Sequence, residues 1–244
     1  MLTTKTVIRL ITMGLLSGGL LFTTLIATTQ AAENPRVKIQ TNHGDIIVEL
    51  DQEKAPKSVA NFLQYIEDKF YTNTIFHRVM ANFMIQGGGF TPTFERKETR
   101  PPVSTEFNCD GEKISSTYNL CNEADNGLSN VRGSIAMART SDPHSASAQF
   151  FINVVDNQSL DHTGKTPRGY GYAVFGKVVK GMKVVDTIRN IPTGPGGPFP
   201  MNVPKSSAII LGMTYMNKPA LAPGIPDASN TPPAAPTAPT VTGN

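Results

Sequence analysis

The stretch Ile75–Phe90, IFHRVMANFMIQGGGF, decides how the chain is interpreted. It is rich in Ile, Val and Phe and ends in three glycines, which predicts a strand, a short connection, a second strand and a tight turn. In such a hairpin Arg78, Phe83 and Gln86 share one face. One cation, one aromatic ring and one amide form a poor acid–base site but a good surface for binding a peptide.

A second stretch, Ala136–Phe151 (AMARTSDPHSASAQFF), places Gln149 and Phe151 at a similar strand end. Elsewhere in the chain the spacing of apolar residues changes several times. It predicts a hairpin over Arg36–Leu50, a helix over Pro56–Lys69, a short helix over Gly181–Arg189 and a last strand over Ser207–Tyr215. The first helix rests on an apolar stripe at i, i+3, i+4 and i+7, formed by Val59, Phe62, Leu63 and Ile66.

Two segments are expected to be loops. Thr91–Asn126 is polar and charged, and Ile191–Pro204 is rich in Pro and Gly. Many short strands with only two helices indicate an all-β barrel or sandwich with helical caps. The residues alone do not separate these two architectures.

The first 31 residues read as a cleaved secretory signal. Lys5 and Arg9 precede an apolar run from Leu10 to about Ala27, and Thr29-Gln30-Ala31 supplies small residues for cleavage. The alternative is an uncleaved membrane anchor, because the run approaches the length that spans a bilayer. We expect the mature protein to be periplasmic.

The two cysteines, Cys109 and Cys121, are expected to be exported to the periplasm, which is a compartment that oxidises thiols. A disulfide between them would close a short loop and contribute roughly 3 kcal/mol on the chain-entropy model. Two free thiols, or half of a metal site, are the alternatives. No CxxC and no nearby His supports the metal.

Composition excludes several function classes. The formal charge of +3 and the lack of a Lys/Arg block argue against nucleic acid. The four histidines are scattered, with no i, i+4 pair, so neither a metal nor a cofactor is expected. His77 adjoins Arg78, and adjacent strand residues face opposite ways, so we expect a hydrogen-bonded core histidine there. Residues 218–244 are Pro, Ala and Thr with few charges, which predicts a disordered tail.

Three segments resemble the signature segments of cyclophilins, which are peptidyl-prolyl cis-trans isomerases. They are FHRVMANFMIQGGGF (Phe76–Phe90), MAR followed by SAQFFI (Met137–Ile152), and YAVFGKVVKGM (Tyr172–Met182). The resemblance covers residues 35–217 and is greatest to the exported bacterial type. It implies a mainly β fold, namely a closed eight-stranded antiparallel β-barrel capped by two α-helices. The sequence contains no sign of an oligomer, so we expect a monomer.

The resemblance also implies roles for individual residues. Those with catalytic roles are Arg78, Phe83, Gln86 and Gln149. Those that bind substrate are Met84, Ala138, Arg139, Phe151, Leu160 and Tyr172. The implied partners are proline-containing unfolded or exported polypeptides.

The chain departs from the family pattern in three places. Ser159 stands where many members have Trp, which predicts weak cyclosporin binding because a large aromatic contact is missing. Tyr172 stands where many have His. Residues from about 103 to 121 form an insertion that holds both cysteines.

Two functions from different classes follow. The first is an isomerase in which Arg78 donates a hydrogen bond to the prolyl nitrogen in the twisted transition state. The second is a peptide-binding chaperone module that uses the same groove with little turnover.

Overall fold

The computed structural model describes residues 33–100, 103–105, 116–118 and 120–217. The predicted signal segment, Cys109 and the C-terminal tail lie outside these residues. Within them a nine-stranded antiparallel sheet has the order β3-β13-β1-β2-β10-β8-β9-β5-β4. Its strands are β1 (Arg36–Thr41), β2 (Gly44–Leu50), β3 (Thr74–Ile75), β4 (Arg78–Met80), β5 (Met84–Gly87), β8 (Ser134–Met137), β9 (Phe150–Asn153), β10 (Val174–Lys180) and β13 (Ile209–Asn217).

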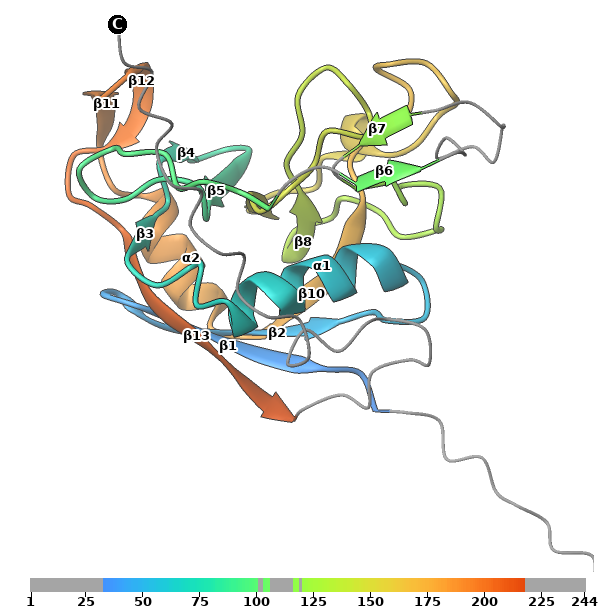
Figure 1. The fold of residues 1–244 in the computed structure, drawn as a ribbon. Helices are drawn as coiled ribbons and strands as arrows, with labels where there is room; N and C mark the ends of the chain where they lie inside the picture. The colour runs from blue at the N-terminus through green and yellow to red at the C-terminus, as the bar shows by residue number, and fades with distance from the viewer. Residues whose placement is uncertain (1–32, 101–102, 106–115, 119, 218–244) are drawn as a thin grey trace, which may run out of the picture. The chain divides into compact units, whose positions relative to one another are not determined.

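This sheet is strongly curled (Figure 1). Its two outermost members, β3 and β4, are separated along the chain only by Phe76 and His77. β3 pairs with β13, β4 pairs with β5, and between them the Phe76 amide donates to the carbonyl of Ala208 at 2.9 Å. The prediction of a mainly β fold with two α-helices is confirmed for the described residues.

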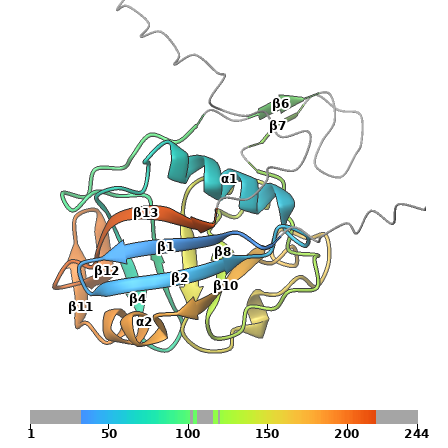
Figure 2. The same ribbon diagram turned by 90° about the horizontal axis from the view of Figure 1, so that it is seen from below.

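Both helices, α1 (Pro56–Glu67) and α2 (Met182–Arg189), lie on the same side of the strands β13, β1 and β2 (Figure 1) and flank these strands at opposite edges when seen from below (Figure 2). The predicted apolar stripe of α1 is buried, as are Val185 and Ile188 of α2. α1 ends two residues earlier than the pattern predicted. Lys69 lies beyond the helix with a φ of 53° and therefore does not complement its dipole. No helix among the described residues is both long and apolar enough to cross a bilayer.

A carboxylate from a distant loop caps α1. Ala55 at the N-cap supplies no side-chain hydrogen bond. Instead Glu123 accepts from the Lys57 amide at 3.0 Å, from the Ser58 amide at 2.7 Å and from the Ser58 hydroxyl at 2.8 Å. These bonds satisfy backbone donors that the first turn of a helix leaves free, and they place a negative charge at the positive end of the helix dipole. Glu123 thereby fixes the segment after Cys121 against α1.

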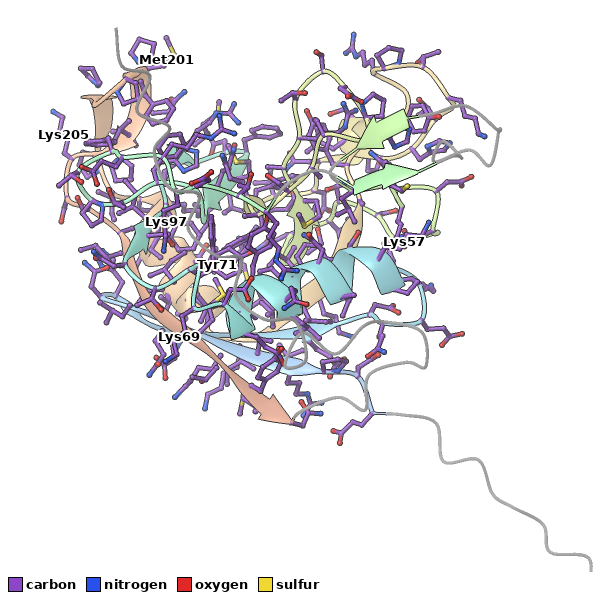
Figure 3. The ribbon with its side chains drawn as sticks, in the orientation of Figure 1. Lys57, Lys69, Tyr71, Lys97, Met201 and Lys205 are labelled. Atoms are coloured by element: carbon purple, nitrogen blue, oxygen red, sulfur yellow. The ribbon has the colours of Figure 1, made fainter. Side chains whose placement is uncertain are left out.

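The structure corrects both loop predictions. Ile191–Pro204 contains a two-stranded hairpin, β11 (Thr193–Gly196) with β12 (Phe199–Pro204), from which Met201 projects with 62% of its surface exposed (Figure 3). Prolines are tolerated there because both strands are edge strands, whose outward positions need no N–H donor. The polar stretch before Cys121 contains a second small pair, β6 (Val103–Thr105) with β7 (Ser116–Tyr118).

The core divides into two clusters because neighbouring strand residues face opposite ways. In β5, Ile85 joins the main core, which also holds the buried faces of both helices, whereas Met84 joins a small second cluster. In β9, Ile152 belongs to the main core and Phe151 to the second cluster. We call the second set the pocket cluster; its buried members are Met84, Ala136, Phe151 and Val174.

Tyr71 and Lys97 brace the segment between α1 and β3 (Figure 3). The buried Tyr71 hydroxyl donates to the carbonyl of Ala148 at 2.8 Å. The Lys97 ammonium donates to the carbonyl of Phe70 and lies 5.0 Å from the centre of the Phe70 ring. Burial lowers the pKa of Lys97. The Tyr71 bond ties the segment before β3 to Ala148, the residue just before Gln149.

Candidate functional site

Adjacent strands bring Arg78 and Gln86 together. They are directly opposite each other in the β4–β5 ladder, so both side chains leave the same face of the sheet. One guanidinium nitrogen of Arg78, Nη1, donates to Oε1 of Gln86 at 3.3 Å. Nε2 of Gln86 in turn donates to Oε1 of Gln149 at 3.0 Å. The cation and the two amides therefore form one hydrogen-bonded chain.

The hydrogen-bonded side chains of Arg78 and Gln86 border a pocket of about 310 Å³. Buried Met84 and Phe151, which are 2% and 4% exposed, belong to the pocket cluster below it. The lining consists of all the predicted site residues except Gln149: Arg78, Phe83, Met84, Gln86, Ala138, Arg139, Phe151, Leu160 and Tyr172. Apolar side chains, together with the guanidinium groups of Arg78 and Arg139, suit a small ring whose peptide remains partly in water.

The Arg78 charge is available to a ligand. No ion pair within the described part of the chain involves Arg78. Its guanidinium carbon lies 5.9 Å from the centre of the Phe83 ring, and Nη2 is 3.3 Å from the Met80 sulfur, a weak acceptor. An arginine held by an amide, a ring and a sulfur remains a strong hydrogen-bond donor.

Gln149 lies beside this pocket, where it lines an adjacent hollow of about 140 Å³. Gln86, Ala138 and Arg139 line both spaces, so the two hollows form neighbouring parts of one groove. The carbonyl of Gln149 accepts from the Ala138 amide at 2.9 Å, which holds the two strand ends together.

Each of the three glycines after Gln86 is explained by a different neighbour. A Cβ on Gly87 would lie 2.9 Å from the Phe76 ring and 3.0 Å from the Ile75 carbonyl oxygen. Gly88 has a φ of +83°, and a Cβ there would meet the rings of Phe150 and Tyr71 at 2.9 Å. At Gly89 the Cβ would meet the side chain of Gln149 at 2.7 Å. Gly89 therefore leaves room for the side-chain amide of Gln149.

An asparagine network behind the pocket was missed in the sequence. The buried Asn153 donates to Oδ1 of Asn130 at 3.1 Å, and Asn157 donates to Oδ1 of Asn153 at 2.7 Å and to the Phe83 carbonyl at 2.8 Å. Asn130 also donates to the carbonyls of Leu160 and Tyr172, both at 3.2 Å. The network thus holds the main chain of three pocket residues. The available signal was Asn at both ends of the run after Ile152, NVVDN.

His77 points away from the pocket, as predicted. It is 3% exposed, and its ring stacks on Phe199 at 5.3 Å and contacts Phe90 at 4.8 Å. The predicted hydrogen bond is not found at Nδ1, which has no partner within the described residues, and the ring packs against aromatic side chains. Burial lowers the pKa of His77 to about 4, which keeps the ring neutral at neutral pH.

Comparison with known proteins places this site in a family context. Residues 36–214 match the model described as "Cyclophilin type peptidyl-prolyl cis-trans isomerase/CLD". Peptidyl-prolyl cis-trans isomerase B of Escherichia coli is 49% identical over 178 residues, which are 73% of this chain and 98% of that protein. The cyp18 isomerase of Streptomyces antibioticus is 52% identical over 158 residues, 65% of this chain and 85% of that protein.

A solved structure shows the same fold. It is the crystal structure of a cyclophilin-type peptidyl-prolyl cis-trans isomerase from Cryptosporidium parvum in the presence of the dipeptide Ala-Pro. The TM-score is 0.57 at 27% sequence identity, and the match covers 75% of this chain and 99% of that chain.

Proposed function

We propose a mechanism for this chain on the premise that it belongs to the cyclophilin family and is a peptidyl-prolyl cis-trans isomerase. The reaction breaks no covalent bond and needs no proton transfer. It rotates an amide whose barrier of about 18–20 kcal/mol comes from resonance between nitrogen and carbonyl. Catalysis therefore requires groups that bind the twisted amide more tightly than the planar one.

Arg78 is the group that makes this distinction. Rotation ends the resonance and localises a lone pair on the prolyl nitrogen, which can then accept a hydrogen bond from the guanidinium. The planar amide offers no such acceptor. Removing roughly 6–7 kcal/mol of barrier would accelerate rotation about 10⁵-fold. The observation that carries the proposal is the position of Arg78, which has no carboxylate partner among the described residues, in the lining of a pocket with apolar walls.

The other side chains hold the substrate while it turns. Phe83, Met84 and Phe151 surround a space that suits the proline ring, with Leu160 beside them. Gln86 and Gln149 present amide groups along the groove, where they can bind the peptide backbone next to the proline. With the ring and one flank fixed, the other flank of the peptide is free to rotate.

Replacing Arg78 tests the mechanism. Arg78→Ala should lower kcat/KM on an X–Pro peptide by two or more orders of magnitude while peptide binding weakens much less, since the apolar contacts remain. Arg78→Lys should recover only part of the loss, because an ammonium lacks the planar fork. Unchanged turnover in Arg78→Ala would refute the mechanism. Peptide binding by the wild type without turnover would instead favour a chaperone module that uses the same groove.

We further propose that the substrates are exported polypeptides. The support is the sequence of residues 1–31, read as a cleaved signal before an isomerase domain over 35–217, with 218–244 as a tail. N-terminal sequencing of protein recovered from a periplasmic fraction should begin near Ala32. Recovery of the uncleaved chain with the membranes would show that the segment is an anchor.

We make two further proposals, one about closure of the sheet and one about cyclosporin. We infer that the sheet closes into a barrel through residues 74–80, because β3 and β4 are consecutive segments of that run. We infer weak cyclosporin binding, because Ser159, exposed in the short 3-10 helix Gln158–Leu160, offers no aromatic contact. Calorimetric titration with cyclosporin would test the second inference, and sub-micromolar affinity would contradict it.

A further inference from the structure

Arg139 makes more hydrogen bonds to the main chain than any role in substrate binding requires. Its Nε donates to the carbonyl of Gly171 at 2.8 Å, and Nη2 donates to the carbonyl of Pro167 at 2.9 Å. Nη1 donates to the carbonyls of Thr140 at 2.9 Å and Ser141 at 3.4 Å. These acceptors belong to two loops, one after β8 and the other before β10. The guanidinium therefore joins two segments that are distant in sequence.

The same guanidinium stacks on a pocket wall. Its carbon lies 4.7 Å from the centre of the Tyr172 ring. The Tyr172 ring meets Phe151 edge to face, with centroids 5.6 Å apart and planes at 80°. Arg139, Tyr172 and Phe151 thus form a layered contact that ends in the pocket lining. The Tyr172 amide also donates to the carbonyl of Leu160 at 2.9 Å, which fixes another wall.

The hydrogen bonds of Arg139 indicate that this residue positions other parts of the protein and does not itself bind the peptide. A guanidinium has five N–H donors, and those of Arg139 are directed mainly at carbonyls of its own chain. Moving the group to reach a peptide would break the part-buried bond to the Gly171 carbonyl, which is costly, as well as the exposed bonds to the other three carbonyls. Arg78, by contrast, bonds to one amide and one sulfur among the described residues and remains available.

We propose that Arg139 is a positioning residue that sets the width of the proline pocket by holding the Tyr172 ring, with the two flanking loops as the anchors of its guanidinium. This inference rests on the proposed function of the groove. It replaces direct substrate contact, the role that resemblance implied for Arg139, with an action through Tyr172. It also explains why an arginine fits here, because a planar fork spreads five donors over three nitrogens and can bond to carbonyls of two loops while it stacks on a ring, whereas lysine has all its donors on one nitrogen.

The test is a double-mutant cycle in the full chain with Arg139→Lys, Tyr172→Leu and both together. Isomerisation is measured on three short peptides that differ only in having Ala, Glu or Lys before the proline. Arg139→Lys should raise KM about three- to ten-fold, the scale of a lost cation–π contact, with kcat changed less than about two-fold. The factor should be the same for all three peptides. In the Tyr172→Leu background Arg139→Lys should have no further effect on KM.

Two results would overturn the proposal. An effect of Arg139→Lys that is larger for the Glu peptide than for the Lys peptide would mean direct contact with substrate. An undiminished effect in the Tyr172→Leu background would mean that Arg139 does not act through that ring. Inactive wild-type protein would instead refute the proposed function, and the same cycle would then be measured on peptide Kd.

A spectroscopic readout covers the case in which Arg139→Lys is poorly stable. In protein with labelled tyrosine, the Tyr172 ring signals are identified by their loss in Tyr172→Phe. Arg139→Gln, which keeps a donor but loses the planar cation, should shift and broaden those signals. Unchanged Tyr172 signals in Arg139→Gln would also overturn the proposal.

Discussion

Gly89→Ala should damage the site while leaving the fold intact. An ideal Cβ at Gly89 would lie 2.7 Å from the Cγ, Cδ and Nε2 atoms of Gln149, and the ordinary limit of such contacts is near 3.4 Å. The Gln149 amide must therefore move by roughly 0.7 Å or more, since its carbonyl is fixed by Ala138 and its side chain is the part that can yield. That shift stretches the 3.0 Å bond from Gln86, which in turn orients Gln86 toward Arg78.

The expected cost falls on catalysis. A displacement approaching 1 Å in a positioned group can cost on the order of 100-fold in rate, so we expect kcat/KM to fall by about 10- to 100-fold. The φ of Gly89 lies outside the left-handed region, so Ala is not strained there. The free energy of unfolding should stay within about 1 kcal/mol of wild type. The assays are isomerisation of an Ala–Pro peptide and unfolding in urea.

Substitutions at two other glycines serve as comparisons for Gly89→Ala. Gly212→Ala is the matched control, because a Cβ there meets nothing within 4 Å, and both activity and stability should be unchanged. Gly88→Ala should lose stability, because its positive φ and the nearby rings of Phe150 and Tyr71 combine strain with overpacking. Wild-type kcat/KM in a stable Gly89→Ala protein would refute the link between the position of Gln149 and catalysis.

Two further predictions concern stability, and a third concerns the disulfide. Because the folded-state pKa of His77 is lowered from 6.5 to about 4, the unfolded chain binds a proton first as the pH falls, so stability is lost between these values. The loss should be about 2.5 kcal/mol by pH 4.5 and should be absent in His77→Phe, as measured by urea unfolding at several pH values. Glu123→Ala should lower the free energy of unfolding by about 1–2 kcal/mol, because it removes the cap of α1. Mass spectrometry of unreduced protein should find Cys109 linked to Cys121.

Each of these has a contradicting outcome. Equal pH dependence in wild type and His77→Phe would show that His77 is not the titrating group. Glu53, an exposed acid in the turn before α1, gives the matched control for the cap, and its replacement by Ala should change stability by less than about 0.5 kcal/mol. A loss as large at Glu53 would mean that general charge near the helix, and not the hydrogen bonds of Glu123, matters. Two freely alkylated thiols would exclude the disulfide.

The parts of the fold that sequence predicted are those with a local period. The stripe of α1 follows the 3.6-residue period, and the alternation in β4 and β5 separated Arg78 from His77. Strand alternation also anticipated that Arg78 and Gln86 share a face. These features depend on neighbours within a few residues, which is the range over which backbone geometry fixes direction.

The parts that could not be predicted depend on contacts between distant segments. β11 and β12 looked like a loop, because Pro and Gly are common to loops and to edge strands. The space that Gly89 leaves for Gln149 exists only once two strands have met. Likewise Glu123 caps a helix more than sixty residues earlier in the chain, and nothing in its own neighbourhood indicates that role.

The division of the interior into a main core and a pocket cluster bears on how this protein can change over evolutionary time. Neighbouring residues of the same strands belong to different clusters and face opposite ways, so a lineage can alter Met84 or Val174 on one face while the residues that pack against the helices stay the same on the other. Substrate preference can then drift without a matching loss of foldability. A directed-evolution library confined to the pocket cluster should accordingly yield many folded variants with new peptide preferences.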